Sequence, residues 1–202
     1  MIINNIDISS RGLFLVNLEV GEAEPKTNYI DLPFSDGSID LTEALGYVTY
    51  RDRLVRATFL IKNYDESSYE SIKKELHGLK KTISTKDGYY FIGRIRIKPF
   101  IRRGTAGVFD LEVLCQPYMY KNDITVVNVS LNGTQEVILS NEQKRAVPEF
   151  TTDAEIQVTF GSNAYTINAG THTLPIVLEE GDNAVQLVGT ANVSISYQEG
   201  VL

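Results

Sequence analysis

Apolar and polar residues alternate along several segments of the chain, and this two-residue period is the feature that most constrains its fold. Residues 53–61 read RLVRATFLI, residues 89–97 read YYFIGRIRI, and residues 108–115 read VFDLEVLC. Because successive side chains of a strand point to opposite faces, each segment is predicted to be a strand with one buried and one wet face. A turn signal at Lys86-Asp87-Gly88 predicts that residues 80–85 pair with residues 89–97 as a hairpin.

Only one segment has helical spacing. Residues 67–78 read SSYESIKKELHG, and their apolar members recur every three or four positions: Tyr69, Ile72 and Leu76. Ser67 and Glu70 have the spacing of a capping box, and Gly78 suits the left-handed position that ends a helix. We predict one helix, docked on a sheet by a narrow apolar stripe.

The chain changes character near residue 124. Up to that position acids and bases balance at seventeen each, whereas from residue 125 onward nine acids face only Lys144 and Arg145. Past the same point turn signals recur roughly every 8–12 residues, as at Asn132-Gly133 and Gly161-Ser162-Asn163. We predict a mainly β fold with two antiparallel β-sandwich-like domains, residues 1–124 with the helix and residues 125–202 as a small sandwich.

The sequence carries none of the common catalytic or metal-binding motifs. It lacks a Gly-rich phosphate loop with Lys-Ser/Thr, a Gly-x-Ser-x-Gly elbow, a His-Glu-x-x-His pair and a cysteine pair. Its two histidines lie far apart, and His77 is expected to complement the dipole at the end of the helix. Cys115 stands among apolar residues and is expected to be a buried structural thiol. We expect no enzyme, no cofactor and no metal.

Paired carboxylates leave a glycosidase activity possible. Glu179 and Glu180 are adjacent, so on a strand they point to opposite faces. Asp110 and Glu112 share a face, but beside an arginine-rich strand they are expected to form cross-strand pairs.

Positive charge is concentrated in one row: Arg94, Arg96, Lys98, Arg102 and Arg103. The row is either the solvated face of an amphipathic strand or a contact surface for an acidic partner. Because the charge of the first domain is balanced, a protein partner is favoured over nucleic acid. No apolar run is long enough for a membrane helix, and the N-terminus lacks the pattern of a signal peptide, so we expect synthesis in the cytoplasm and no membrane contact.

Residues 29–61 carry a more specific pattern, YIDLPFSDGSIDLTEALGYVTYRDRLVRATFLI, with Pro33, an Asp36-Gly37 turn, the run Asp40-Leu41-Thr42-Glu43, and then Tyr50 and Arg53. This segment resembles the N-terminal domain of the distal tail (Dit) proteins of siphophages and prophages of Gram-positive bacteria. The similarity continues in order through the helix, the strand YYFIGRI, the segment LEVLCQPYMY and the C-terminal residues 178–202. Within the segment, Asp40 is expected to cap a short turn, with Glu43 reaching back.

The resemblance implies a structural protein of the phage tail tip, present in the virion. It implies a homohexameric ring hub that joins the tail tube protein to the tail-tip, baseplate or tail-associated proteins, with DNA only passing through its channel. The first domain would form the belt of the ring, and the second would be a galectin-like or carbohydrate-module-like sandwich. We hypothesise that six arginines contribute to contacts between subunits or with tail proteins: Arg51, Arg53, Arg94, Arg96, Arg102 and Arg103.

The alternative is a carbohydrate-binding module that docks host cell-surface glycans without catalysis. Sugar sites commonly stack an aromatic ring beneath the sugar, and the chain has no Trp. The tyrosines of residues 125–202 are Tyr165 and Tyr197, while Phe150 and Phe160 are expected in the core. The sequence leaves this alternative open.

Overall fold

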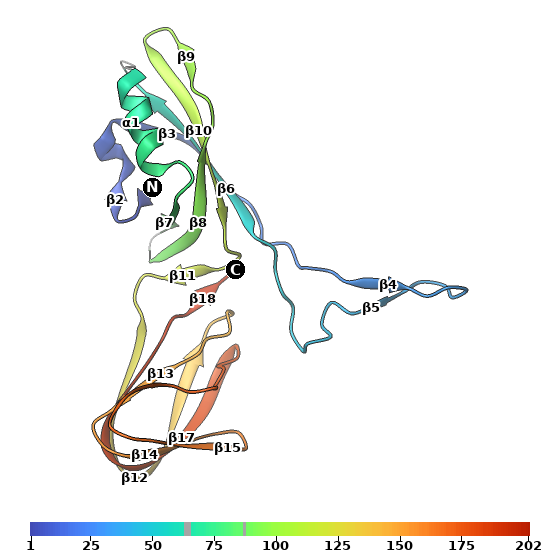
Figure 1. Ribbon diagram of the computed structural model, residues 1–202, viewed down its shortest axis with the longest axis vertical. Coiled ribbons are helices and arrows are strands. Elements are labelled where there is room, and N and C mark those ends of the chain that lie inside the picture. Colours follow the sequence, from blue (N-terminus) through green and yellow to red (C-terminus); the bar gives the residue numbers. More distant parts are fainter. Residues whose placement is uncertain (63–65, 87) are drawn as a thin grey trace. The chain divides into compact units, whose positions relative to one another are not determined.

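The structure, a computed structural model, describes residues 1–62, 66–86 and 88–202 (Figure 1). By their internal contacts these residues divide into two units, Met1–Pro117 and Tyr118–Leu202. Both units consist mainly of antiparallel strands, and one α-helix lies among the described residues of the first. The predicted mainly β fold with antiparallel sheets and one helix is therefore confirmed.

The first unit is built on one antiparallel sheet. Its strands lie in the order β2-β1-β7-β8-β10-β6-β3, and β9 pairs with β10. Along the chain the strands are β1 (Ile2–Ile3), β2 (Ile6–Asp7), β3 (Leu13–Val20), β6 (Arg53–Ile61), β7 (Lys80–Lys86), β8 (Tyr89–Ile97), β9 (Ile101–Arg103) and β10 (Ala106–Cys115). A short 3-10 helix, η1 (Ile8–Arg11), separates β2 from β3.

The two-residue period separates the faces of this sheet as predicted. On β6 and β10 the odd-numbered residues are buried, including Val55, Phe59, Leu111 and Val113, while their neighbours are exposed or half-buried. The predicted hairpin of β7 and β8 is also present, and Gly88 has φ +82°; Asp87 lies outside the described residues.

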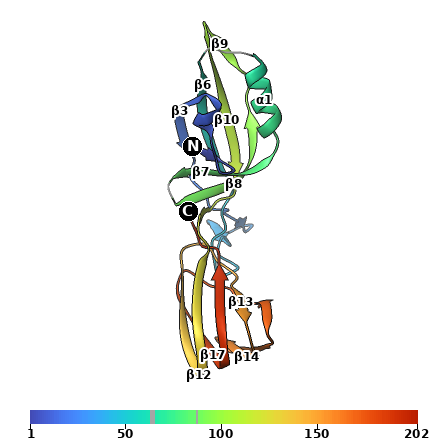
Figure 2. The same cartoon turned by 90° about the vertical axis from the view of Figure 1, so that its left-hand side faces the viewer.

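Helix α1 (Glu66–Leu76) covers the buried face of the sheet (Figure 2). It docks through the predicted stripe of Tyr69, Ile72 and Leu76, and the Tyr69 ring meets the Phe109 ring edge-on at 5.6 Å between centroids. The predicted capping box is wrong in register, because the helix already includes Glu66 and Ser67 therefore lies inside its first turn. Past its end Gly78 has the predicted left-handed conformation, with φ +79°.

Two further predictions concern His77 and Cys115. His77 Nδ1 accepts a hydrogen bond from the backbone N–H of Ile97 at 3.0 Å, so the imidazole links the end of the helix to the sheet. Cys115 is buried as predicted, and burial raises the pKa of its thiol to about 12.

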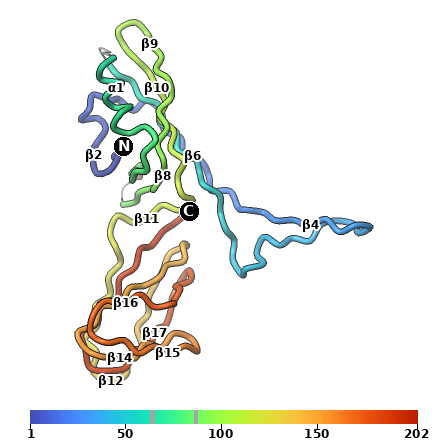
Figure 3. The backbone as a smooth tube through the Cα atoms, in the orientation of Figure 1, coloured from blue at the N-terminus to red at the C-terminus, as the bar shows by residue number. Residues whose placement is uncertain are grey.

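Between β3 and β6 the chain forms an arm, residues 21–52 (Figure 3). The arm prolongs the β3–β6 pair as a two-stranded ribbon: Gly21 N–H donates to the Leu54 carbonyl, and Lys26 N–H to that of Thr49. Farther out, β4 (Tyr29–Asp31) pairs with β5 (Ser38–Asp40). The two legs are hydrogen-bonded to each other near the base of the arm and again at β4 and β5.

The second unit has the sheet order β15-β14-β17-β13-β16, with β12 paired to β17. Its strands are β11 (Met119–Lys121), β12 (Thr125–Asn141), β13 (Glu149–Thr152), β14 (Ile156–Phe160), β15 (Asn163–Ile167), β16 (Gly170–Thr173), β17 (Gly181–Tyr197) and β18 (Gly200–Val201). The predicted turn at residues 161–163 is present between β14 and β15, whose terminal residues Phe160 and Asn163 pair. Phe150 is fully buried in the core of this unit, and Phe160 packs against it.

The turn predicted at Asn132-Gly133 is wrong. β12 continues through both residues for 17 residues, and Gly133 pairs with Gly189 of β17. Both glycines have positive φ, +95° and +151°, a conformation that other residues rarely adopt. Pairing along the whole of β17, which runs without a break from Gly181 to Tyr197, therefore outweighs the local turn preference of Asn-Gly.

Candidate assembly surfaces

The structure places the six arginines of the hypothesis in different settings. Arg94 and Arg96 lie on the exposed face of β8, and Arg102 and Arg103 on β9, near a turn. Arg51 is exposed at the base of the arm. Of the six, therefore, Arg94 and Arg96 share a defined surface.

Arg53 is buried, with 4% of its surface exposed. Its guanidinium lies 5.4 Å from the centre of the Phe91 ring, and its Nε and Nη2 have no hydrogen-bond partner among the described residues. Burial lowers its pKa, while the nearby charge of Glu22 acts in the opposite direction. Because strand side chains alternate between the two faces, Arg53 lies on the same buried face as Val55. This burial differs from the exposed position that an interface residue would need.

Cross-strand rows organise the exposed face of the sheet. One row joins Arg56 of β6, Glu112 of β10 and Arg96 of β8. Glu112 pairs with Arg56 at 3.1 Å and with Lys98 at 3.0 Å, which is the cross-strand pairing predicted from the sequence. Hydrogen bonds from Lys98 and then Arg56 hold the pKa of Glu112 below its ordinary value. Because both oxygens of Glu112 are occupied, no carboxylate among the described residues pairs with Arg96.

The neighbouring row joins Leu54, Leu114 and Arg94. Both leucines are exposed, at 40% and 55%, and Arg94 donates to the carbonyl of Gly78. Together with Arg96 they line a groove of about 330 Å³ on the sheet face. Glu112, which is held by Arg56 and Lys98, also lines the groove. The surface thus combines apolar walls with two arginines for which no carboxylate partner is found within the described ranges.

The arm has a surface of the opposite charge. In the described segment 22–52 no residue is buried, although the arm bears large apolar side chains: Tyr29, Ile30, Leu32, Phe34, Ile39, Leu45 and Tyr47. The arm carries seven carboxylates against Lys26 and Arg51, whereas the rest of residues 1–117 carries nine carboxylates against fourteen Lys and Arg. The balanced charge of the first unit is therefore divided between an acidic arm and a basic body.

Asp40 fixes a turn on the returning leg of the arm. Its Oδ1 accepts the backbone N–H of Thr42 at 2.9 Å, in agreement with its predicted capping role, while the contact predicted for Glu43 stays a prediction. Hydrogen bonds from the side chain and then the backbone of Thr42 lower the pKa of Asp40. Two further turns follow, in which Ala44 N–H donates to the Leu41 carbonyl and Gly46 N–H to that of Glu43. The stretch is a structural part of the ribbon.

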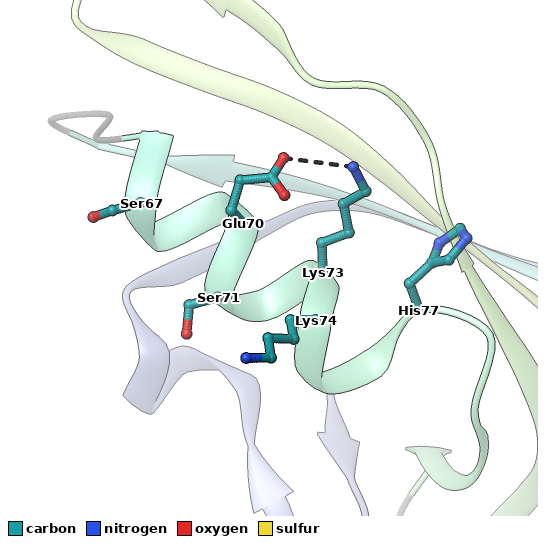
Figure 4. A pocket seen from close by; sticks show the side chains of 6 residues that line it. All are labelled: Ser67, Glu70, Ser71, Lys73, Lys74 and His77. Carbon is teal, nitrogen blue, oxygen red and sulfur yellow. Dashed lines mark hydrogen bonds and ion pairs between the residues drawn. The ribbon is translucent and has the colours of Figure 1, made fainter.

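The outer surface of α1 forms a wide and shallow depression of about 820 Å³ (Figure 4). Its side chains stand apart along the helix, and Lys73 pairs with Glu70 at 3.5 Å. The labelled groups do not converge on one point, as a catalytic site requires. In the part of the chain that the structure describes, no cluster of His, Cys, Asp and Glu has a metal-binding arrangement.

The two tyrosines considered for sugar stacking, Tyr165 and Tyr197, pack in or against the core of the second unit. Tyr197 is buried and its hydroxyl donates to the Ser140 carbonyl at 2.6 Å. Tyr165 is half-buried and packs against the same core. Neither ring therefore offers a fully open stacking face.

A search of solved structures supplies the decisive comparison. The crystal structure of SPP1 Dit (gp 19.1), described as a paradigm of the hub adsorption apparatus of phages that infect Gram-positive bacteria, matches with a TM-score of 0.71. The match covers 100% of this chain and 98% of that chain. The chain has the fold of a siphophage distal tail protein.

This similarity to Dit is one of fold, because sequence identity is 15%. No protein-family model matches the sequence, and a search of curated proteins gave no significant match. Among the described residues, no helix has the length and apolar character needed to cross a membrane.

Proposed function

We propose that the protein is a non-enzymatic structural subunit of a phage tail hub. In this proposal six copies form a ring that joins the tail tube protein to the tail-tip or tail-associated proteins, and DNA passes through the channel. The observation that carries the proposal is the Dit-like fold along the whole chain. Its location would be the tail tip of the virion, and the second unit would be the galectin-like or carbohydrate-module-like sandwich.

The arm supports the assembly part of the proposal. An isolated two-stranded ribbon is marginally stable in water, and this one lacks a buried residue in segment 22–52. Phe34 and Leu45 are 110% and 77% exposed, respectively. Apolar side chains gathered on such an element mark a surface that becomes covered in an assembly.

The charge division supports a head-to-tail arrangement. A closed ring joins two different surfaces of each subunit, so opposite charges on those surfaces attract neighbouring copies. The acidic arm and the basic body of the first unit provide such a pair. Arg51, Arg94, Arg96, Arg102 and Arg103 remain proposed contact residues between subunits or with tail proteins, whereas a role for Arg53 requires that its buried side chain become accessible.

Assembly of the full chain tests the proposal. We expect light scattering over a concentration series, with electron microscopy of the same samples, to show annular particles containing six copies. The matched variant replaces residues 24–51 by an Asn-Gly turn, which keeps β3 and β6 paired. This variant should retain the far-ultraviolet circular dichroism of a β protein but no longer form the annular particles. If the arm-deleted variant still forms rings, assembly through the arm is refuted. If phage particles contain no annular layer of this chain, the hub function itself is refuted.

A further inference from the structure

We propose that the groove between Leu54 and Leu114 receives the arm tip of a second copy, with Phe34 as the inserted side chain and Asp36 facing Arg94 and Arg96. This inference rests on the proposed ring and names the two surfaces that would meet. Its basis is the geometry of the groove, the exposure of Phe34 and the charges beside each.

The groove has the composition of an anchor site. Its apolar walls come from Leu54 on β6 and Leu114 on β10, which are directly paired, and Arg94 pairs with Leu114 on the other side. Arg96 follows two residues along β8 on the same face, and Glu112, the carboxylate opposite it, also lines the groove but is held by Lys98 and Arg56. Apolar walls flanked by uncompensated arginines suit an aromatic residue that is accompanied by a carboxylate.

The arm tip has the matching features. Phe34 is fully exposed and has φ +64°, a left-handed conformation that is unfavourable for a residue with a side chain. Asp36 follows it two residues later, before the Gly37 that completes the turn. A hydrogen bond from the Ser35 N–H to the Leu32 carbonyl closes this turn, and the tip holds an aromatic ring outward beside a negative charge.

The ribbon prevents Phe34 from filling the groove of its own copy. Thirteen residues separate Gly21 from Phe34, a reach of up to about 45 Å when extended. Leu54 lies at the arm base, where its carbonyl accepts the Gly21 N–H, and the ladder between the two legs keeps the tip away from that base. The same reach exceeds the diameter expected of a folded body of this size, about 30 Å, so the tip can cross to a neighbour.

Cross-linking between two differently substituted full-length copies tests the contact. One copy carries Phe34→Cys and the other Leu54→Cys, and the two are mixed in equal amounts under oxidising conditions. We expect mixed disulfide dimers to form roughly tenfold faster than with Val126→Cys, a control of similar exposure on the second unit. The native Cys115 is buried and serves as an internal check that the copies remain folded.

Charge reversal supplies a second measurement on the same cross-link. Arg96→Glu in the receiving copy should slow its formation about tenfold, and Asp36→Arg in the donating copy should restore the rate. Lys74→Glu, a change of an exposed charge on α1 outside the groove, should leave the rate unchanged.

The outcomes separate this inference from the proposed ring. Annular particles without selective cross-linking at Leu54 would overturn the groove contact and leave the ring standing. Selective cross-linking without closed particles would support the contact and overturn the ring. Equal rates at Leu54 and Val126, or failure of Asp36→Arg to restore the rate lost in Arg96→Glu, would also overturn the contact.

Discussion

Glu199 fastens the chain ends of the second unit, and its removal gives the most specific stability prediction. The residue is 5% exposed. One oxygen accepts the Thr125 hydroxyl and lies 3.0 Å from Lys121 Nζ, and the other accepts the backbone N–H of Glu142 at 3.2 Å. These partners come from β11, from the start of β12 and from the residue that follows β12.

The substitution Glu199→Gln preserves the shape of the side chain but removes its charge. The charge-assisted bond to Lys121 is lost, and such bonds contribute about 1.5–3 kcal/mol, with the lower end applying because Lys121 is 31% exposed and still pairs with Glu142. With the amide oxygen toward Thr125, the new NH₂ group faces the N–H of Glu142, a donor that is then left unpaired at about 1–3 kcal/mol. We expect a loss of about 2–4 kcal/mol in the free energy of unfolding, or about 10–20 °C in the melting temperature of this unit.

The effect depends on pH with a definite sign. Burial raises the pKa of Glu199, but the hydrogen bonds from Thr125 and Lys121 lower it by more, and the net shift is downward from 4.5. A carboxyl with a lowered folded pKa stabilises the fold above its unfolded pKa and loses that contribution as pH falls through the folded value. The difference between wild type and Glu199→Gln should therefore be complete at pH 7 and shrink below about pH 4.5.

Differential scanning calorimetry from pH 3 to pH 8 measures this difference, with the transition of the second unit followed separately from that of the first. Glu136→Gln, an exposed carboxylate on β12, is the matched control and should change stability by less than about 0.5 kcal/mol. Equal melting temperatures for wild type and Glu199→Gln at pH 7, or a difference that persists undiminished at pH 3, would refute the reasoning.

Three further predictions follow from single sites. Arg53→Met should raise the stability of the first unit by about 1–2 kcal/mol in urea unfolding, because it removes a buried cation with unpartnered nitrogens and loses its contact with Phe91 and its attraction to Glu22; destabilisation would contradict this. Gly189→Ala should cost about 2–4 kcal/mol by the same assay, since its Cβ would lie 2.9 Å from Ile156 Cγ2 at φ +151°, and an unchanged midpoint would count against it. Cys115 should react with a thiol reagent only after unfolding, because burial raises its pKa to about 12, and rapid labelling of the native protein would show otherwise.

Apolar spacing in the sequence correctly predicted which side chains of a helix or strand are buried. The stripe of Tyr69, Ile72 and Leu76 identified the helix and its buried side, because only one helical face can meet the sheet. Alternation in β10 identified the burial of Cys115 and the wet position of Glu112 for the same reason. The Glu112 ion pairs were also predictable, since cross-strand neighbours on one face are close.

Local patterns failed where distant pairing competes with a turn preference. Asn132-Gly133 has a strong hairpin signal, yet it lies inside β12 because β17 offers a partner for every residue of the strand. The capping box at Ser67 missed the start of the helix, since capping spacing alone does not locate that start.

By itself, the sequence determined the alternating strands, the single helix, the lack of familiar catalytic motifs and the acidic composition of residues 21–52. Only the tertiary structure decided that these residues form an uncovered ribbon, that Arg53 is buried and that Arg94 and Arg96 border an apolar groove. The reason is physical: the periods of a strand, 2 residues, and of a helix, about 3.6 residues, are set by backbone geometry, whereas exposure and grooves depend on which strands pair across long separations in the chain.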